Sequence, residues 1–167
     1  IAGGGYAEYA VVPASQLLPV PAGVTLIDSA ALPEVASTVW STIVTDAGLQ
    51  AGDLLLVHGG GSGIGTHAIQ VAKALGARVA VTVGSEAKAQ RCRDLGADIV
   101  LNYRDQDFAA ELAGQVDVIL DIMGGSYLSR NIDALAVGGR LVIIGMQGGF
   151  TGEANVGALI GKRARII

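Results

Sequence analysis

The sequence predicts an α/β domain with a doubly wound parallel sheet. From Asp53 onward, short runs of Val, Leu and Ile alternate with helical stretches, and most of these runs are apolar at every position. A strand that is apolar on both faces is buried on both faces, which is typical of a parallel sheet covered by helices. The chain also carries 25 glycines among 167 residues, and glycines of this kind end helices and form turns.

Six strands and four helices are expected in the alternating region. The strands are expected at residues 54–58, 78–83, 99–102, 116–121, 140–144 and 165–167. The helices between them are expected at 64–75, 86–95, 107–113 and 128–137, each followed by a glycine. The first helix has the clearest apolar stripe, formed by Ile64, Ala68, Val71, Ala72 and Leu75.

The region before Asp53 has a different pattern. Residues 5–12 predict a strand because they are rich in Tyr and Val and end at Pro13. Further prolines at 19 and 21 resist helix and predict an irregular connection. A helix is expected from Asp28 or Ser29, either of which can cap it, to Gly48, with Pro33 in its first turn.

Composition excludes several classes of protein. The formal net charge is −4, with 15 acidic and 11 basic residues, which argues against nucleic acid or an anionic membrane as a general partner. One cysteine excludes a disulfide framework and a Cys-rich zinc site. Apolar runs stay well below the roughly 20 residues of a membrane helix. We expect a cytoplasmic protein and, because the chain begins at Ile1 and ends in a strand-like run, a piece of a longer one.

The segment from His58 to Gly65 is the most informative motif. It follows a predicted strand, precedes a predicted helix and reads His-Gly-Gly-Gly-Ser-Gly-Ile-Gly. Glycines in such a turn let the backbone approach a pyrophosphate, which the helix N-terminus then binds. From Gly60 the spacing is Gly-x-Ser-x-x-Gly, so Ser62 replaces the middle glycine of the dinucleotide motif. Dinucleotide binding is favoured, and a plain tight turn is the alternative.

The end of the second predicted strand favours NADPH over NADH. Sites for NAD place an acidic residue there to bind the ribose 2′-hydroxyl. Here Gly84 and Ser85 follow the strand and Lys88 comes one helical turn later. A small hydroxyl with a cation suits a 2′-phosphate. Glu86 keeps NADH open as an alternative, and Lys88 has the alternative of being an ordinary solvated helix residue.

Seven short motifs in order carry a resemblance to a known family. The motifs are Gly-Gly-Tyr-Ala-Glu-Tyr at 4–9, Ala-Leu-Pro-Glu at 31–34, Leu-Gln-Ala-Gly-Asp at 49–53, the glycine turn at 58–65, Leu-Gly-Ala-Asp at 95–98, Asn-Tyr-Arg at 102–104 and Asp-Ile-Met-Gly-Gly-Ser-Tyr at 121–127. With these motifs, the chain resembles the zinc-free quinone oxidoreductases of the medium-chain dehydrogenase/reductase superfamily over nearly its whole length.

The resemblance implies two domains. Residues 1–27 would be a remnant of a GroES-like catalytic β domain, and residues 28–167 a C-terminally truncated, NADPH-binding Rossmann domain. It also implies a homodimer of the full-length protein.

The resemblance further implies a set of cofactor contacts. Thr38 would lie near the nicotinamide, the glycine turn on the pyrophosphate, and Gly84, Ser85 and Lys88 around the 2′-phosphate. Tyr103 would lie along the adenine, with core shielding as its alternative, and Met146 has simple packing as its alternative. The complete expected set is Thr38, Gly60, Gly61, Ser62, Gly63, Ile64, Gly65, Gly84, Ser85, Lys88, Tyr103, Asp121, Met123, Gly124, Ile144, Gly145 and Met146.

No metal is expected, because catalytic zinc needs three Cys, His or Glu ligands: His58 and His67 are too few and lie around the glycine turn, and the one cysteine, Cys92, is expected on a helix face. Without a metal, hydride from the nicotinamide must reach an electron-poor acceptor, a quinone or an activated enone. No catalytic residue is assigned; Tyr6 and Tyr9 are candidates by type alone.

Several alternatives remain at this point. One is an enoyl reductase of the same superfamily, and another is a non-catalytic NADPH-binding protein like the lens crystallin of this family. A short-chain dehydrogenase is disfavoured because its Tyr-x-x-x-Lys is absent, and a methyltransferase because no acid ends the second strand.

Overall fold

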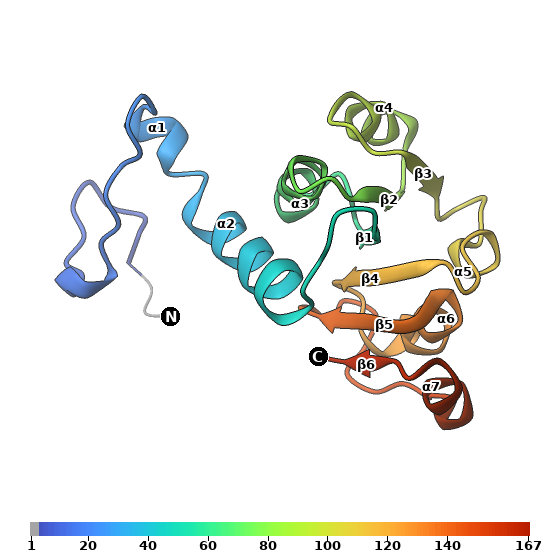
Figure 1. Cartoon of the computed structure of the whole chain (residues 1–167). Helices are drawn as coiled ribbons and strands as arrows, with labels where there is room; N and C mark the ends of the chain where they lie inside the picture. Colours follow the sequence, from blue (N-terminus) through green and yellow to red (C-terminus); the bar gives the residue numbers. More distant parts are fainter. Residues whose placement is uncertain (1–3) are drawn as a thin grey trace. The chain divides into compact units, whose positions relative to one another are not determined.

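The computed structural model describes residues 4–167, and the chain divides into two units (Figure 1). The first unit ends at Pro33, and the second runs from Glu34 to Ile167. The first contains a short 3₁₀ turn, η1 (Ala14–Gln16), and one turn of helix, α1 (Leu26–Ser29). Within the described residues, no helix combines the length and the apolar character that crossing a membrane requires.

The strand predicted at residues 5–12 is wrong, because this segment forms no strand. The side chains of Tyr6, Tyr9 and Val11 are fully or almost fully exposed. A strand becomes stable only when a neighbouring strand accepts and donates its backbone hydrogen bonds. Tyr and Val favour the extended conformation of a strand, but no strand in the described part of the chain pairs with this segment.

The helix predicted to start at Asp28 or Ser29 is interrupted. Thr25 caps α1, accepting a hydrogen bond from the Asp28 N–H at 3.1 Å. A second helix, α2 (Pro33–Val39), starts at Pro33 and continues into a π-helical segment, η2 (Trp40–Asp46). Proline disfavours the helical conformation in the residue before it and is well accepted at the first helical position. Pro33 therefore lies in the first turn of a helix, as expected, but that helix begins at Pro33 itself and not at Asp28 or Ser29.

Six parallel strands form one sheet, in the order β3-β2-β1-β4-β5-β6. This confirms the predicted doubly wound α/β architecture. The bounds are β1 (Leu54–His58), β2 (Arg78–Val83), β3 (Ile99–Asn102), β4 (Val116–Asp121), β5 (Leu135–Ile143) and β6 (Arg165–Ile166). The strand order reverses between β1 and β4, where open α/β sheets bind ligands at the carboxyl ends of their strands.

Two apolar cores cover the two faces of the sheet. Along β1, Leu55 and Val57 face a core built with η2, α3 (Gly63–Ala74) and α4 (Glu86–Asp94). Leu54 and Leu56 face the other core, built with α5 (Phe108–Glu111) and α6 (Leu128–Ala134). In Figure 1, α3 lies on one side of the strands, while α5 and α6 lie on the other. This alternation explains why every residue of β1 is apolar except His58.

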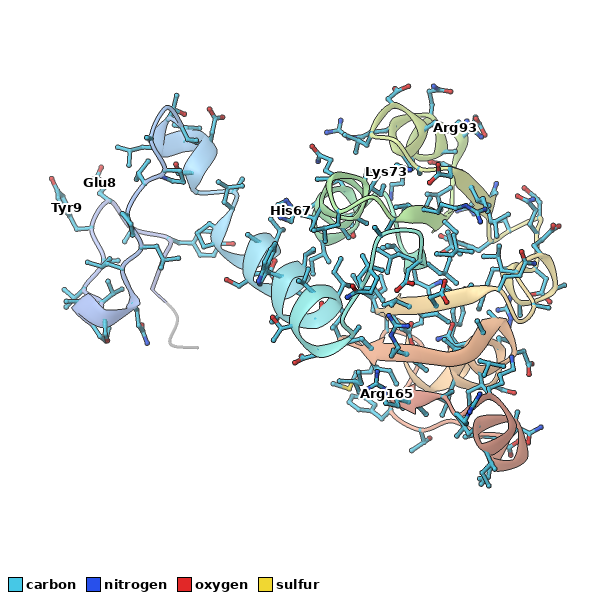
Figure 2. All side chains as sticks on the ribbon, viewed as in Figure 1. Glu8, Tyr9, His67, Lys73, Arg93 and Arg165 are labelled. Atoms are coloured by element: carbon cyan, nitrogen blue, oxygen red, sulfur yellow. The ribbon has the colours of Figure 1, made fainter. Side chains whose placement is uncertain are left out.

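Glycines end several helices as predicted. Gly76, Gly96 and Gly114 follow α3, α4 and α5 with φ values of 80°, 103° and 68°. Two ion pairs lie on the outer surface of these helices. Lys73 of α3 pairs with Asp98, and Arg93 of α4 pairs with Glu86 (Figure 2 labels both cations).

The last third of the chain differs most from the expectation. The helix predicted at 128–137 ends at Ala134, because Leu135 to Val137 belong to β5, and Gly138 lies inside that strand with φ 80°. The helix predicted at 107–113 is shorter, since Asp107 is the cap of α5. A further helix, α7 (Val156–Lys162), precedes β6 and was not predicted.

Candidate cofactor-binding site

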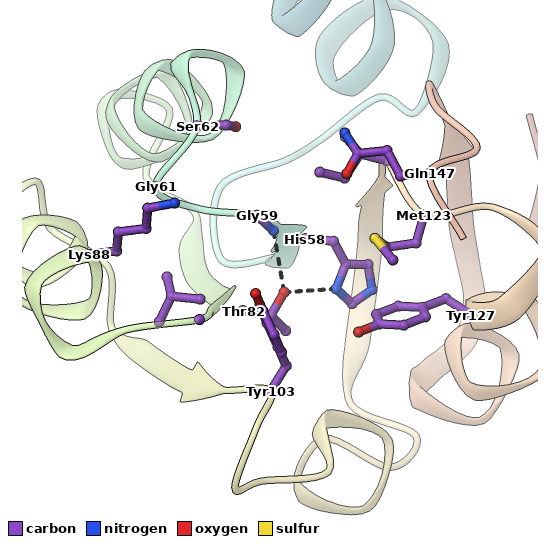
Figure 3. A pocket seen from close by; sticks show the side chains of 13 residues that line it. His58, Gly59, Gly61, Ser62, Thr82, Lys88, Tyr103, Met123, Tyr127 and Gln147 are labelled. Atoms are coloured by element: carbon purple, nitrogen blue, oxygen red, sulfur yellow. Dashed lines mark hydrogen bonds between the residues drawn. The ribbon is translucent and has the colours of Figure 1, made fainter. Parts of the chain in front are cut away.

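A cavity of about 400 Å³ opens at the carboxyl ends of β1, β2 and β4, where the strand order reverses (Figure 3). Such a crevice at a topological switch point is the usual ligand site of an open α/β sheet. Its lining residues are His58, Gly59, Gly61, Ser62, Thr82, Val83, Gly84, Lys88, Tyr103, Ile122, Met123, Tyr127 and Gln147. We call this space the first cavity.

The glycine turn between β1 and α3 forms one wall of the first cavity. A Cβ at position 60 would lie 2.6 Å from the Cβ of Val81, and one at position 65 would lie 2.5 Å from the Gly59 carbonyl oxygen. Gly59 itself has φ 75°, a conformation that side chains disfavour. The turn therefore accepts only glycine at these positions, because β1, β2 and the start of α3 approach one another closely.

Ser62 explains the departure from the strict glycine motif. It is the N-cap of α3, and its hydroxyl accepts the Gly65 N–H at 3.0 Å. A serine side chain stabilises a helix start by about 1 kcal/mol compared with alanine. The chain thus has a capping hydroxyl where the dinucleotide motif has its middle glycine.

The opposite wall follows β2. Lys88 of α4 is exposed, and its aliphatic stem covers Gly61, where an added Cβ would lie 3.0 Å from the Lys88 Cδ. Tyr103 packs its hydroxyl against Gly84, which leaves no room for a side chain at that position. Ser85 caps α4 and accepts the Lys88 N–H at 3.4 Å. Gly84 and the cap together place the lysine at the rim of the cavity.

Lys88 is the one cation in a lining that contains no carboxylate, among the residues that the structure describes. The competing acid on the same helix, Glu86, is bound by Arg93 at 2.6 Å and does not line the cavity. The electrostatics of this wall therefore favour an anionic group over a sugar hydroxyl that needs an acceptor.

His58 lies fully buried at the floor of the first cavity. Its Nε2 is 2.7 Å from the Asn131 Oδ1, and its Nδ1 is 3.1 Å from the Thr82 hydroxyl. The rings of Phe108 and Tyr127 pack edge-on against it at centroid distances of 4.6 and 5.0 Å. Burial lowers the pKa of His58 to about 4; the Asn131 hydrogen bond opposes this shift and the charge of Arg130 adds to it. The ring is neutral at physiological pH.

A second cavity of about 320 Å³ lies beside the loops that follow β4 and β5. Its lining is glycine and apolar side chains throughout: Gly124, Gly125, Leu128, Ile143, Ile144, Gly145, Met146, Gly149, Phe150 and Gly152. The two loops touch backbone to backbone, since a Cβ at position 125 or 152 would collide with a carbonyl of the other loop. This space suits a flat apolar group.

The structure distributes the predicted site residues between the two cavities. The first cavity gathers Gly61, Ser62, Gly84, Lys88, Tyr103 and Met123. The second gathers Gly124, Ile144, Gly145 and Met146. Immediately behind the lining, in the glycine turn and at the helix caps, lie Gly60, Gly63, Ile64, Gly65 and Ser85.

The remaining two predicted residues lie outside both linings, the glycine turn and the helix caps. Thr38 donates its hydroxyl to Glu34 Oε1 at 3.0 Å within α2. Asp121 is fully buried at the end of β4 and accepts the N–H groups of Met123 and Gly124 at 2.7 and 3.0 Å. Burial raises the pKa of Asp121, while these hydrogen bonds oppose the shift. In this structure Asp121 shapes the loop that reaches both cavities.

Sequence reasoning missed seven lining residues of the first cavity: His58, Gly59, Thr82, Val83, Ile122, Tyr127 and Gln147. A usable signal existed for several of them. His58, Thr82 and Val83 stand at the carboxyl ends of correctly predicted strands, which is where ligands of such sheets bind. Gln147 comes from the loop after β5, whose path the pattern did not reveal.

Comparison with known proteins agrees with this fold. The family model described as "Zinc-binding dehydrogenase" matches residues 63–167. Human quinone oxidoreductase is 30% identical over 98% of this chain and 51% of the relative. A crystal structure of an NAD-dependent alcohol dehydrogenase superposes with a TM-score of 0.88 at 37% identity, covering 98% of this chain and 49% of that one.

A third match is the quinone oxidoreductase of Thermus thermophilus, solved alone and with NADPH. It superposes with a TM-score of 0.86 at 30% identity, over 98% of this chain and 53% of that one. The chain thus spans about half the length of these relatives. The resemblance to quinone oxidoreductases of the medium-chain superfamily is confirmed.

The zinc in the family's description has no counterpart in the described residues. Between residues 4 and 167, no three His, Cys, Asp or Glu side chains are grouped to hold a metal ion. Both ring nitrogens of His58 are engaged, and Cys92 is buried in α4. These residues do not fit a zinc site, although the family model matches residues 63–167. The chain belongs to the zinc-binding dehydrogenase family.

Proposed function

We propose that this chain is most of the cofactor domain of an NADPH-dependent oxidoreductase that reduces a quinone or an activated enone without zinc. The observation that carries the proposal is the first cavity, which has a glycine turn on one wall, Lys88 on the other and no carboxylate in its described lining. The NADPH complex of the Thermus thermophilus relative, over a fold with a TM-score of 0.86, supports the choice of cofactor.

The glycine turn and the first turn of α3 would hold the pyrophosphate. The first N–H groups of a helix have no acceptor within that helix, and the helix dipole favours negative charge there. The glycines at 60 and 65 bring this backbone close, since any side chain there would meet backbone or Val81. Lys88 and the residues around Ser85 would hold the 2′-phosphate, and Tyr103 would lie along the adenine.

The second cavity would receive the nicotinamide ring. Its lining offers only glycine and apolar side chains, so it orients a flat ring and excludes water. NADPH, when bound, supplies hydride from C4 of that ring. The described residues offer no group of metal-ligating side chains that could place a Lewis acid on the acceptor, and we therefore propose an acceptor that is already electron-poor. No side chain of this chain is assigned the proton transfer.

The remaining features of the proposal concern the whole protein. Residues 1–27 would belong to a GroES-like catalytic domain and residues 28–167 to the cofactor domain. The protein would act in the cytoplasm as a homodimer on a small-molecule substrate. Gel filtration with light scattering of the intact protein tests the dimer.

The test of the activity is NADPH oxidation by the intact protein, followed by the absorbance of the reduced nicotinamide, with 1,2-naphthoquinone and separately with a 2-enoyl thioester. Turnover of the quinone is the expected result. Turnover of the thioester alone would replace the quinone reductase by an enoyl reductase. Tight NADPH binding with neither turnover would support a non-catalytic NADPH-binding protein and contradict the proposal.

A further inference from the structure

A directed chain of hydrogen bonds links the glycine turn to the interior of the protein. The Gly59 N–H donates to the Thr82 hydroxyl oxygen at 3.3 Å, that hydroxyl lies 3.1 Å from His58 Nδ1, and His58 Nε2 lies 2.7 Å from Asn131 Oδ1. The members come from β1, β2 and α6, which are far apart in the sequence. Figure 3 shows the two links at Thr82 as dashed lines.

The Asn131 oxygen at the end of this series fixes which atom donates and which accepts in each of its hydrogen bonds. Oδ1 of Asn131 can only accept, so His58 Nε2 carries the hydrogen. The neutral ring then offers Nδ1 as an acceptor, and the Thr82 hydroxyl donates to it. The oxygen of Thr82 is left to accept from Gly59, so each of the three hydrogen bonds joins one donor to one acceptor.

We propose that His58 is a positioning residue of the cofactor site: its neutral ring orients the Thr82 hydroxyl, which in turn holds the Gly59 amide and the glycine turn. This inference rests on the proposed function. His58, Gly59 and Thr82 all line the first cavity, so a shift of this chain of hydrogen bonds moves the wall that would meet the cofactor. No side chain in it is proposed to react.

Protonation of His58 would reverse its hydrogen bond with Thr82. An imidazolium ring donates from both nitrogens, so the Thr82 oxygen would accept from His58 as well as from Gly59, and the hydrogen of the Thr82 hydroxyl would lose the acceptor that the neutral ring gives it. Charged or titratable groups also face the ring: Arg130, which Asp107 binds at 2.7 Å; Tyr127, which packs on the ring; and Asp121, which interacts with Asn131. Lys88 and Tyr103 line the same cavity.

The variant Asn131→Asp tests whether NADPH affinity depends on the protonation state of His58. A carboxylate facing Nε2 favours the imidazolium and raises the pKa of His58 toward neutrality. We expect the dissociation constant of NADPH for this variant of the intact protein to rise at least about fivefold from pH 8 to pH 6. The unaltered protein and Phe108→Leu, which loses a ring contact to His58 and no hydrogen bond, should change in parallel with each other and by less than about twofold.

The double variant Asn131→Asp, Thr82→Val separates positioning from general destabilisation. Without the Thr82 hydroxyl, the charge on His58 can no longer reach Gly59, so the extra pH dependence should disappear. An extra dependence that persists in the double variant, or that is absent from Asn131→Asp, would overturn the proposal. Circular dichroism at each pH confirms that the compared proteins are folded.

Hydrogen exchange tests the same chain of hydrogen bonds without any cofactor. In the unaltered protein we expect the Gly59 amide to be protected. In Thr82→Val we expect its exchange to accelerate at least about tenfold, while neighbouring amides keep their rates. Equal Gly59 exchange in both proteins would contradict the role of His58 even if NADPH binds. The expected exchange behaviour with no NADPH binding would contradict the proposed function and leave the hydrogen bond by which Thr82 holds the Gly59 amide supported.

Discussion

The two cavities at the carboxyl edge of the sheet are both shaped by closely packed glycines, but their lining side chains differ in chemistry. Both depend on glycines where backbones approach too closely for a side chain. The first cavity, however, contains a cation, two phenols and a buried histidine, while the second has no polar side chain in its described lining. The difference teaches that glycine supplies the space in both, and the neighbouring side chains decide which part of a ligand each can take.

One polar and one apolar cavity side by side suit a ligand with one charged end and one flat apolar end. Charged groups gain from Lys88 and the start of α3, and a planar ring gains from contact with apolar walls. The predictions below act on one cavity at a time.

The largest effect is expected for Gly65→Ala. The added Cβ would lie 2.5 Å from the Gly59 carbonyl oxygen and 2.7 Å from the Gly60 Cα, and neither backbone atom can move without opening the turn. Overpacking of this kind costs about 3 kcal/mol of unfolding free energy. NADPH affinity should fall at least about a hundredfold. Denaturant unfolding and cofactor titration measure the two effects.

Gly161→Ala in α7 is the matched control. An added Cβ at that helical position meets no atom within 4 Å. Alanine should stabilise the helix there by up to about 1 kcal/mol. If both alanine variants had the same stability and NADPH affinity, the close approach at the glycine turn would not limit the first cavity.

The second effect is on stability at acid pH and comes from His58. Because the pKa of His58 is lowered from 6.5 to about 4 in the folded protein, the unfolded chain binds a proton that the folded chain does not. Stability should therefore fall as the pH drops from about 6.5 to about 4, by about 3 kcal/mol in total from this group. His58→Phe should lose this part of the slope. Urea unfolding at successive pH values provides the comparison, and identical slopes would show that His58 titrates normally.

A smaller effect is expected for Lys88→Glu. The change reverses the charge facing the proposed 2′-phosphate, so NADPH affinity should fall about 10- to 100-fold, as for loss of a charge-assisted hydrogen bond. NADH lacks that phosphate and should be affected much less. Arg91→Glu makes the same change of charge on an exposed position of α4 that does not line the cavity. An equal loss of NADPH and NADH in Lys88→Glu would remove the 2′-phosphate assignment.

The smallest effect is expected for Phe150→Ala. Phe150 lines the second cavity but is 86% exposed, so its truncation should change the unfolding free energy by less than about 0.5 kcal/mol. NADPH affinity should change less than about threefold, while the KM for quinone should rise. A large loss of NADPH affinity here would mean that the two cavities are not separate in function.

The sequence predicted the sheet well because burial on both faces leaves a local signature. The bounds of β1, β2, β3 and β4 agree with the predicted ranges. Of these strands, β1, β2 and β4 have a neighbouring strand on each side, and β3 lies at the edge of the sheet. The same kind of pattern was misleading at residues 5–12, where no partner strand exists in the described chain. Whether a strand forms depends on partners as well as on its own residues.

The candidate site was predicted where it follows one strand or one turn. The glycine turn and Lys88 belong to continuous segments, so their positions could be read from spacing. The backbone contact between Gly125 and Gly152 and the link between His58 and Asn131 join segments distant in the sequence. Such pairs depend on the path of loops that carry no periodic pattern.

The central claim is that the first cavity is built for the 2′-phosphate of NADPH. Calorimetric titration of the intact protein with NADPH and with NADH, under the same buffer and salt, tests it most directly. We predict one NADPH site per chain, with NADH binding at least about tenfold more weakly. Equal affinities, or tighter binding of NADH, would contradict the claim.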